Sequence, residues 1–119
     1  MSDTLPPDQE SVLAAVVALE VARSFQGNEP ASTVGLDGQL IGIRCESSQN
    51  PWFVPLVVRG ARPVALSDGP LLGRYWVGED RTGEIVVRVR DGLLASMEYA
   101  WSGSAEPDRW PEPGELTVG

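Results

Sequence analysis

The stretch Gly83–Trp101, with the sequence GEIVVRVRDGLLASMEYAW, decides the fold of this chain. Its apolar and polar residues alternate with a period of two, which is the spacing of a β-strand that buries one face. The dipeptide Asp91-Gly92 interrupts the alternation and is typical of a tight hairpin turn. We therefore expect two antiparallel strands, at Glu84–Arg90 and Leu93–Trp101.

Each of these strands has one apolar face, and the two faces can cover the same side of the sheet. The apolar face of the first strand consists of Ile85, Val87 and Val89. That of the second consists of Leu93, Ala95, Met97, Tyr99 and Trp101, with Leu94 on the other side. The opposite side then carries Arg88, Arg90, Ser96 and Glu98. Cross-strand arginine–glutamate pairs are expected there, each contributing little to stability.

The period of two also predicts strands outside this hairpin. A strand at Leu72–Val77 would complete a β-meander, and further strands are expected at Thr33–Leu36, Leu40–Cys45, Phe53–Arg59 and Val64–Ser67. Leu36-Asp37-Gly38-Gln39 predicts a tight turn between the strands Thr33–Leu36 and Leu40–Cys45. In the second of these strands, Ile41, Ile43 and Cys45 are expected to share a face. Pro55 indicates an edge strand or a bulge, because proline cannot donate a ladder hydrogen bond. The tail is expected to be extended, with a last short strand at Glu115–Val118.

Before residue 33 the apolar residues follow the helical period instead. Pro6-Pro7-Asp8 is typical of a helix entry, and Gly27 of a left-handed stop, so a helix is expected over Asp8–Phe25. This helix is apolar nearly all round, and only Glu20 and Arg23 break the run. We expect the concave face of the sheet to cover it, with a subunit contact as the alternative.

Together these elements predict one α+β domain over residues 1–119. The N-terminal helix packs on one face of a five- to seven-stranded antiparallel sheet. Residues 1–7 are expected to be flexible, and residues 102–119 to form an extended tail.

The composition excludes many kinds of catalytic chemistry. The chain has no histidine, and its nine basic residues are all arginine, so the usual general bases and imidazole metal ligands are missing. The single Cys45 lies in an apolar stretch and is expected to be a buried structural thiol. We expect no enzymatic activity, no metal and no organic cofactor.

The net charge of −8 disfavours nucleic acid and anionic membranes as partners. It favours a basic protein partner, although solubility alone also explains such a charge. The opening MSDTLPPDQE is not a secretory signal, and the longest apolar run, Val12–Leu19, is too short to span a bilayer. Cytoplasmic localisation is therefore expected.

The candidate partner-binding residues are acids in two segments, with one tryptophan as an apolar anchor: Glu79, Asp80, Glu84, Glu106, Asp108, Glu112 and Trp110. The first three could instead bind calcium, but their spacing matches no calcium loop. Asp91 and Glu98 could act as paired carboxylates on a glycoside, but the turn already explains Asp91.

The four tryptophans divide into two pairs. Trp76 and Trp101 lie in expected strands and are predicted to be core residues. Trp52 and Trp110 lie in a loop and in the tail, where they either anchor these segments to the body or contact a partner.

The segment Gly83–Pro113, with the hairpin sequence above and its RWPEP ending, resembles small acidic actinobacterial proteins of unassigned role. In size, acidity and lack of catalytic residues, the whole chain is similar to the immunity proteins of bacterial polymorphic toxin systems. This resemblance implies an inhibitor, of immunity or antitoxin type, that occludes a basic partner protein. We expect the chain to be a monomer or a homodimer. A secretion chaperone or adaptor, and a small-molecule-binding domain with a cavity between helix and sheet, are the alternatives.

Overall fold

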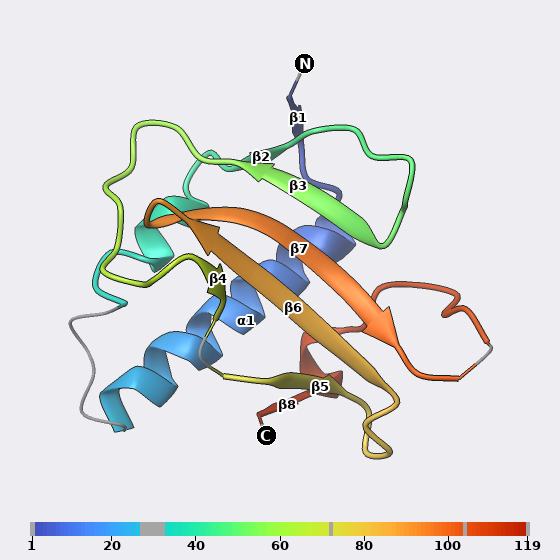
Figure 1. Ribbon diagram of the computed structural model, residues 1–119. Helices are drawn as coiled ribbons and strands as arrows, with labels where there is room; N and C mark the ends of the chain where they lie inside the picture. The colour runs from blue at the N-terminus through green and yellow to red at the C-terminus, as the bar shows by residue number, and fades with distance from the viewer. Residues whose placement is uncertain (1, 27–32, 72, 104, 119) are drawn as a thin grey trace.

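The structure is a computed structural model, and it describes residues 2–26, 33–71, 73–103 and 105–118. In these ranges one α-helix packs on one face of an eight-stranded antiparallel sheet, as Figure 1 shows. The predicted α+β class is therefore confirmed. The sheet has more strands than the predicted five to seven, because the two-residue segments at 3–4 and 69–70 pair as strands without any periodicity to reveal them.

The helix α1 spans Pro7–Gln26. The strands are β1 (Asp3–Thr4), β2 (Arg44–Cys45), β3 (Phe53–Val57), β4 (Gly69–Pro70), β5 (Tyr75–Val77), β6 (Gly83–Arg90), β7 (Leu93–Trp101) and β8 (Leu116–Val118). Two short 3-10 helices are η2 (Asp37–Leu40) and η3 (Pro113–Glu115). The strand order is β1-β2-β3-β7-β6-β5-β8, and β4 pairs with β6 beside this path.

The bounds of α1 agree with the predicted helix to within one residue at each end. Its buried stripe faces the sheet and consists of Val12, Leu13, Val16, Val17, Glu20 and Ser24. Apart from Phe25 near its end, which is 62% exposed, its opposite side exposes mainly small residues such as Ala14, Ala18 and Ala22, which leave little apolar area in water. One covered face is therefore enough. Gly27, the predicted stop of the helix, lies outside the described residues. None of the described helices combines the length and apolar character that a bilayer span requires.

The β6–β7 hairpin forms as predicted, and β6 alternates buried and partly exposed residues along its length. In β7 the predicted alternation is wrong at one end. Arg88 pairs with Ser96 and Val89 pairs with Leu94, so Ala95 is an extra residue in a β-bulge. The bulge reverses the facing of the residues before it, and Leu94 is buried in the core.

The segment 33–45 departs most from the prediction. Thr33–Leu36 is a turn, the expected tight turn is η2, and only Arg44–Cys45 of the next segment is a strand. Ile41, expected on the face of Ile43, is 82% exposed. The cause is Gln39, which is fully buried: its amide donates to the carbonyls of Arg62 and Gly92 and accepts from the Leu94 backbone.

Four other predicted strands are shorter or missing, and of these Phe53–Arg59 forms a strand only at β3 and Glu115–Val118 only at β8. Val64–Ser67 forms no strand, and the segment Leu72–Val77 is a strand only at β5, with residue 72 outside the description. Pro55 lies in β3, which is an interior strand and not an edge. Its carbonyl accepts from the Glu46 backbone just past the end of β2, so the missing N–H falls where that pairing stops.

The segment before the helix was expected to be flexible. It contributes β1, which pairs with β2, and its Leu5 is buried in the core. Cys45 in β2 is only half-buried, and this burial, with a smaller effect from Asp3, raises the pKa of its thiol.

Candidate partner-binding site

Two acidic segments meet at one end of the β6–β7 hairpin. The Ser102 backbone N–H and hydroxyl both donate to the Thr82 carbonyl, at 2.8 and 3.2 Å. This contact places the β5–β6 turn next to the segment that follows β7, and Figure 1 shows both loops at the same end of the hairpin. The turn carries Glu79 and Asp80, and the following segment carries Glu106 and Asp108. We call these four residues the acidic end.

All four carboxylates of the acidic end are exposed, and none has an ion pair within the described part of the chain. Asp80 accepts from the Thr82 hydroxyl at 3.2 Å, and Glu106 accepts from the Trp52 indole N–H at 2.5 Å. These hydrogen bonds orient the two carboxylates without neutralising their charge. The acidic end therefore concentrates four carboxylates without ion pairs among the described residues, although Arg81 and Arg109 are adjacent in sequence.

The other candidate residues lie elsewhere. Glu84 lies on the outer face of the sheet and forms an ion pair with Arg74 at 2.9 Å. Glu112 lies beside the start of α1, in a shallow pocket with Pro7 and Asp8. Trp110 is 5% exposed, so it is not available as the surface anchor that we expected from its place in the tail.

Trp110 belongs instead to an aromatic cluster of Trp52, Tyr99, Trp101 and Trp110. Trp52 is its centre, with ring centroids 5.7 Å from Tyr99 and 5.9 Å from each of the two other tryptophans. These spacings are typical of favourable aromatic pairs. The cluster attaches the tail to the sheet, so Trp52 and Trp110 act as anchors of their segments.

Trp76 does not join this cluster. It is half-buried on the outer face, with the Arg74 guanidinium 4.5 Å and the Arg81 guanidinium 5.8 Å from its ring centroid. Arg88 and Glu98, predicted to pair on the same face, form an ion pair at 3.3 Å. The outer face is thus charged but internally compensated.

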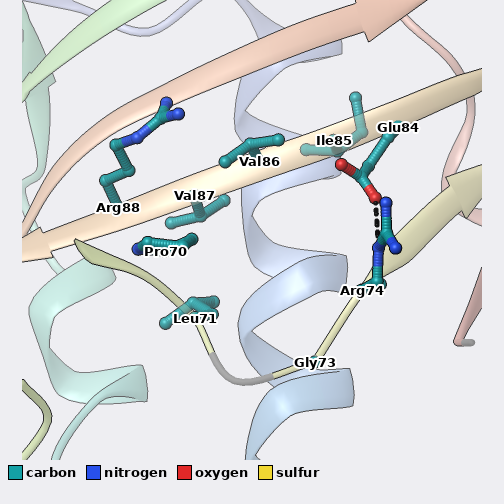
Figure 2. Close-up of a pocket in the computed structure, with 9 residues that line it drawn as sticks. All are labelled: Pro70, Leu71, Gly73, Arg74, Glu84, Ile85, Val86, Val87 and Arg88. Carbon is teal, nitrogen blue, oxygen red and sulfur yellow. Dashed lines mark hydrogen bonds and ion pairs between the residues drawn. The ribbon is translucent and has the colours of Figure 1, made fainter.

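A groove of about 450 Å³ opens on this outer face. It lies beside the part of β6 between its pairing with β4 and its pairing with β5. Figure 2 shows the Glu84 carboxylate turned toward the Arg74 guanidinium across one end of it. Because Glu84 and Arg88 are both paired, the groove offers little net charge to a ligand.

A pocket of about 410 Å³ lies at the acidic end, and we call it the tail pocket. Its lining includes Gly83, Tyr99, Trp101, Glu106 and Asp108. Carboxylates and aromatic rings therefore border the same space. The sequence identified the two acids as candidate binding residues. It predicted Tyr99 only as part of the apolar face of its strand, because no neighbouring residue indicates that its hydroxyl lines a pocket.

A second group of titratable residues lies between α1 and β5, where Glu20 and Tyr75 are fully buried and Arg23 is partly exposed. Glu20 accepts from the Tyr75 hydroxyl at 2.6 Å, the Gly73 N–H at 3.0 Å and the Arg23 guanidinium at 2.6 Å. Burial alone would raise the pKa of Glu20, but these bonds outweigh it and hold the pKa below its ordinary value. Every oxygen of this carboxylate is satisfied, so we assign the group to the stability of the core.

In comparisons with known proteins, no family model matches this chain, and no curated protein or solved structure shows significant similarity to it. The function is therefore argued from the geometry of the acidic end alone.

Proposed function

We propose that this protein is a non-enzymatic binding domain that inhibits a basic partner protein by covering its active or substrate-binding surface, as an immunity or antitoxin protein does. One observation carries the proposal. Two acidic segments more than 20 residues apart in sequence lie side by side at one end of the hairpin, and their carboxylates have no ion pairs within the described residues.

The physical argument is electrostatic steering. Uncompensated charge on one part of a surface attracts an oppositely charged partner and raises the association rate by roughly ten- to a thousandfold. Loops held by a rigid hairpin can present this charge in a fixed arrangement. A charge that served only solubility would not need to be concentrated in this way.

The test begins with capture of proteins from an extract of the source cells on the immobilised protein at low salt, followed by purification of the captured partner. We expect a basic protein whose activity is lost when one equivalent of the acidic protein is added. Its association rate should fall steeply with salt, because the Debye length shortens from about 30 Å at 0.01 M to about 8 Å at 0.15 M.

The matched variants are Glu79→Gln with Asp80→Asn, and Asp37→Asn with Asp68→Asn as the control. Asp37 and Asp68 are exposed acids at the opposite end of the hairpin, where Asp68 accepts from the Asp91 backbone. Each pair removes two charges, but only the first should lower the association rate, by on the order of tenfold. Equal rates for both variants, or association that does not depend on salt, would reject the proposal.

A further inference from the structure

We infer that the tail pocket receives one arginine side chain of the basic partner, with the guanidinium held between the carboxylates and the aromatic rings. This inference rests on the proposed function, and it specifies the chemistry that the acidic end recognises. The lining of the pocket, one unpartnered hydroxyl and the charges nearby support it.

The unpartnered group is the hydroxyl of Tyr99. The side chain is 9% exposed and lines the tail pocket, yet its hydroxyl makes no hydrogen bond within the described residues. No buried side-chain oxygen or nitrogen of the described residues lacks a partner, so this unbonded oxygen is not sealed inside the core and can accept from a ligand in the pocket. Burial, and to a smaller extent Glu115, raises the pKa of Tyr99, so the hydroxyl stays neutral and its oxygen can accept.

Gly83 lets the Tyr99 ring pack directly against the start of β6. A Cβ atom at Gly83 would lie 2.7 Å from Tyr99 Cε1 and 3.2 Å from its oxygen, which is closer than ordinary contact. Gly83 itself lines the pocket. A side chain at this position would displace the ring, so the glycine fixes where the Tyr99 hydroxyl lies in the lining of the pocket.

The charge of the pocket calls for a cation. Glu106 and Asp108 have no ion pair among the described residues, and the neighbouring arginines are engaged elsewhere. Arg109 bonds the Glu115 carboxylate at 2.7 Å and the Trp110 carbonyl at 3.0 Å, and Arg81 lies over Trp76. The chain's own cations thus leave these two carboxylates to an external one.

Arginine fits this lining better than lysine. Its planar guanidinium carries five donors, which can serve two carboxylates and a hydroxyl oxygen together, and it stacks on aromatic rings such as Trp101. Lysine has three donors on a compact, strongly hydrated head group.

The test uses the peptide acetyl-Gly-Arg-Gly-amide as the probe, with its lysine and citrulline analogues, in a titration followed by backbone NMR shifts. We expect saturable shifts at Gly83, Tyr99 and Trp101, with a dissociation constant on the order of millimolar, as suits one side chain. The lysine peptide should bind several-fold more weakly, and the uncharged citrulline peptide should not bind.

Two variants localise the effect. Asp108→Asn and Tyr99→Phe should each raise the dissociation constant of the arginine peptide by about fivefold, whereas the distant Asp37→Asn should leave it unchanged. Tyr99→Phe removes only a hydroxyl that bonds nothing in the described structure, so an unchanged melting temperature should accompany the loss of binding. Binding that is unaffected by both variants, or equal binding of the citrulline or lysine peptide, would overturn the inference. That failure is distinct from failure of the proposed function, which depends on salt-sensitive association and on Glu79 and Asp80.

Discussion

The hydroxyl of Tyr75 donates a 2.6 Å hydrogen bond to the carboxylate of Glu20, which joins strand β5 to helix α1 inside the core. The two residues are 55 positions apart in sequence. A buried carboxylate is unfavourable unless charged and hydrogen-bonding partners surround it, and Arg23 and the Gly73 backbone complete that set here. The bond therefore fixes how the helix is placed along the sheet.

The first prediction concerns acid. Because the pKa of Glu20 is lower in the folded protein than in the unfolded chain, its contribution to stability is complete above the unfolded pKa and is lost as the pH falls through the folded one. Glu20→Gln should lower the free energy of unfolding at pH 7 by about 3 kcal/mol and flatten its decline between about pH 5 and pH 3. Urea unfolding at several pH values measures both effects. Parallel pH curves for the variant and the wild type would contradict the assignment.

The second prediction concerns alkali. Burial raises the pKa of Tyr75, with a further contribution from its bond to Glu20, and burial also raises the pKa of Tyr99. Both tyrosines of the chain should therefore resist ionisation near pH 10, where an unfolded tyrosine is about half ionised. Ultraviolet absorbance should show tyrosinate appearing together with unfolding, and stability should fall as the pH rises through the unfolded pKa. Early ionisation of one tyrosine in the folded protein would be the contrary result.

The third prediction tests the close approach at the β6–β7 turn. Gly92 has a φ of 77°, and a Cβ there would lie 2.6 Å from both the Pro63 Cβ and the Val64 carbonyl oxygen. Gly60 has a similar φ of 73° but open space around it, so Gly60→Ala measures the backbone strain alone. We expect Gly60→Ala to cost about 1–2 kcal/mol and Gly92→Ala clearly more, in chemical unfolding followed by circular dichroism. Equal costs would show that the turn can relax.

The fourth prediction follows from the burial of Trp110. Trp110→Ala should lower the free energy of unfolding by about 3–5 kcal/mol, because it leaves a cavity in the aromatic cluster. Trp76→Ala is the matched control, since the same side chain is only half-buried on the outer face. Trp76→Ala should lower the free energy of unfolding by less than Trp110→Ala does. A stable Trp110→Ala protein would mean that the tail does not depend on this contact.

The fifth prediction tests the helix as core. Val17 is buried against the sheet, whereas the adjacent Ala18 is exposed. Val17→Asp should unfold the domain by burying an unpaired charge, and Ala18→Asp should melt close to the wild type. Similar melting of both variants would show that the sheet does not cover the helix as described.

The sequence predicted those parts of the fold whose signal is local. The helix and the β6–β7 hairpin each carry a clear periodicity, and their bounds are correct to within one residue. The segment around Gln39 was not predictable in the same way, because the partners of its amide lie 23 to 55 residues away. The bulge at Ala95 likewise depends on how two strands pair and not on the composition of either.

In the candidate site, too, the sequence predicted the local features but not the contacts between distant segments. The acids were visible as residue types in turn and tail segments. Their juxtaposition depends on the contact between Thr82 and Ser102, and the role given to Tyr99 depends on a hydroxyl left without a partner in three dimensions. For Trp110 the sequence left two roles open, an anchor of the tail and a contact with a partner, because a tryptophan between polar and proline residues has no local feature that separates a folded-back side chain from an exposed one; its burial identifies the anchor.

The strand order also determines which strands lie at the edges of this sheet. Along its main path the first and last strands, β1 and β8, are the two edges, and they have only two and three residues. The remaining edge segment, β4, has two residues and ends in Pro70, which cannot donate a ladder hydrogen bond. The long strands β6 and β7, with eight and nine residues, lie inside the sheet. Among the described residues the long strands are therefore interior, and the strands at the edges offer only two or three residues to which another strand could add.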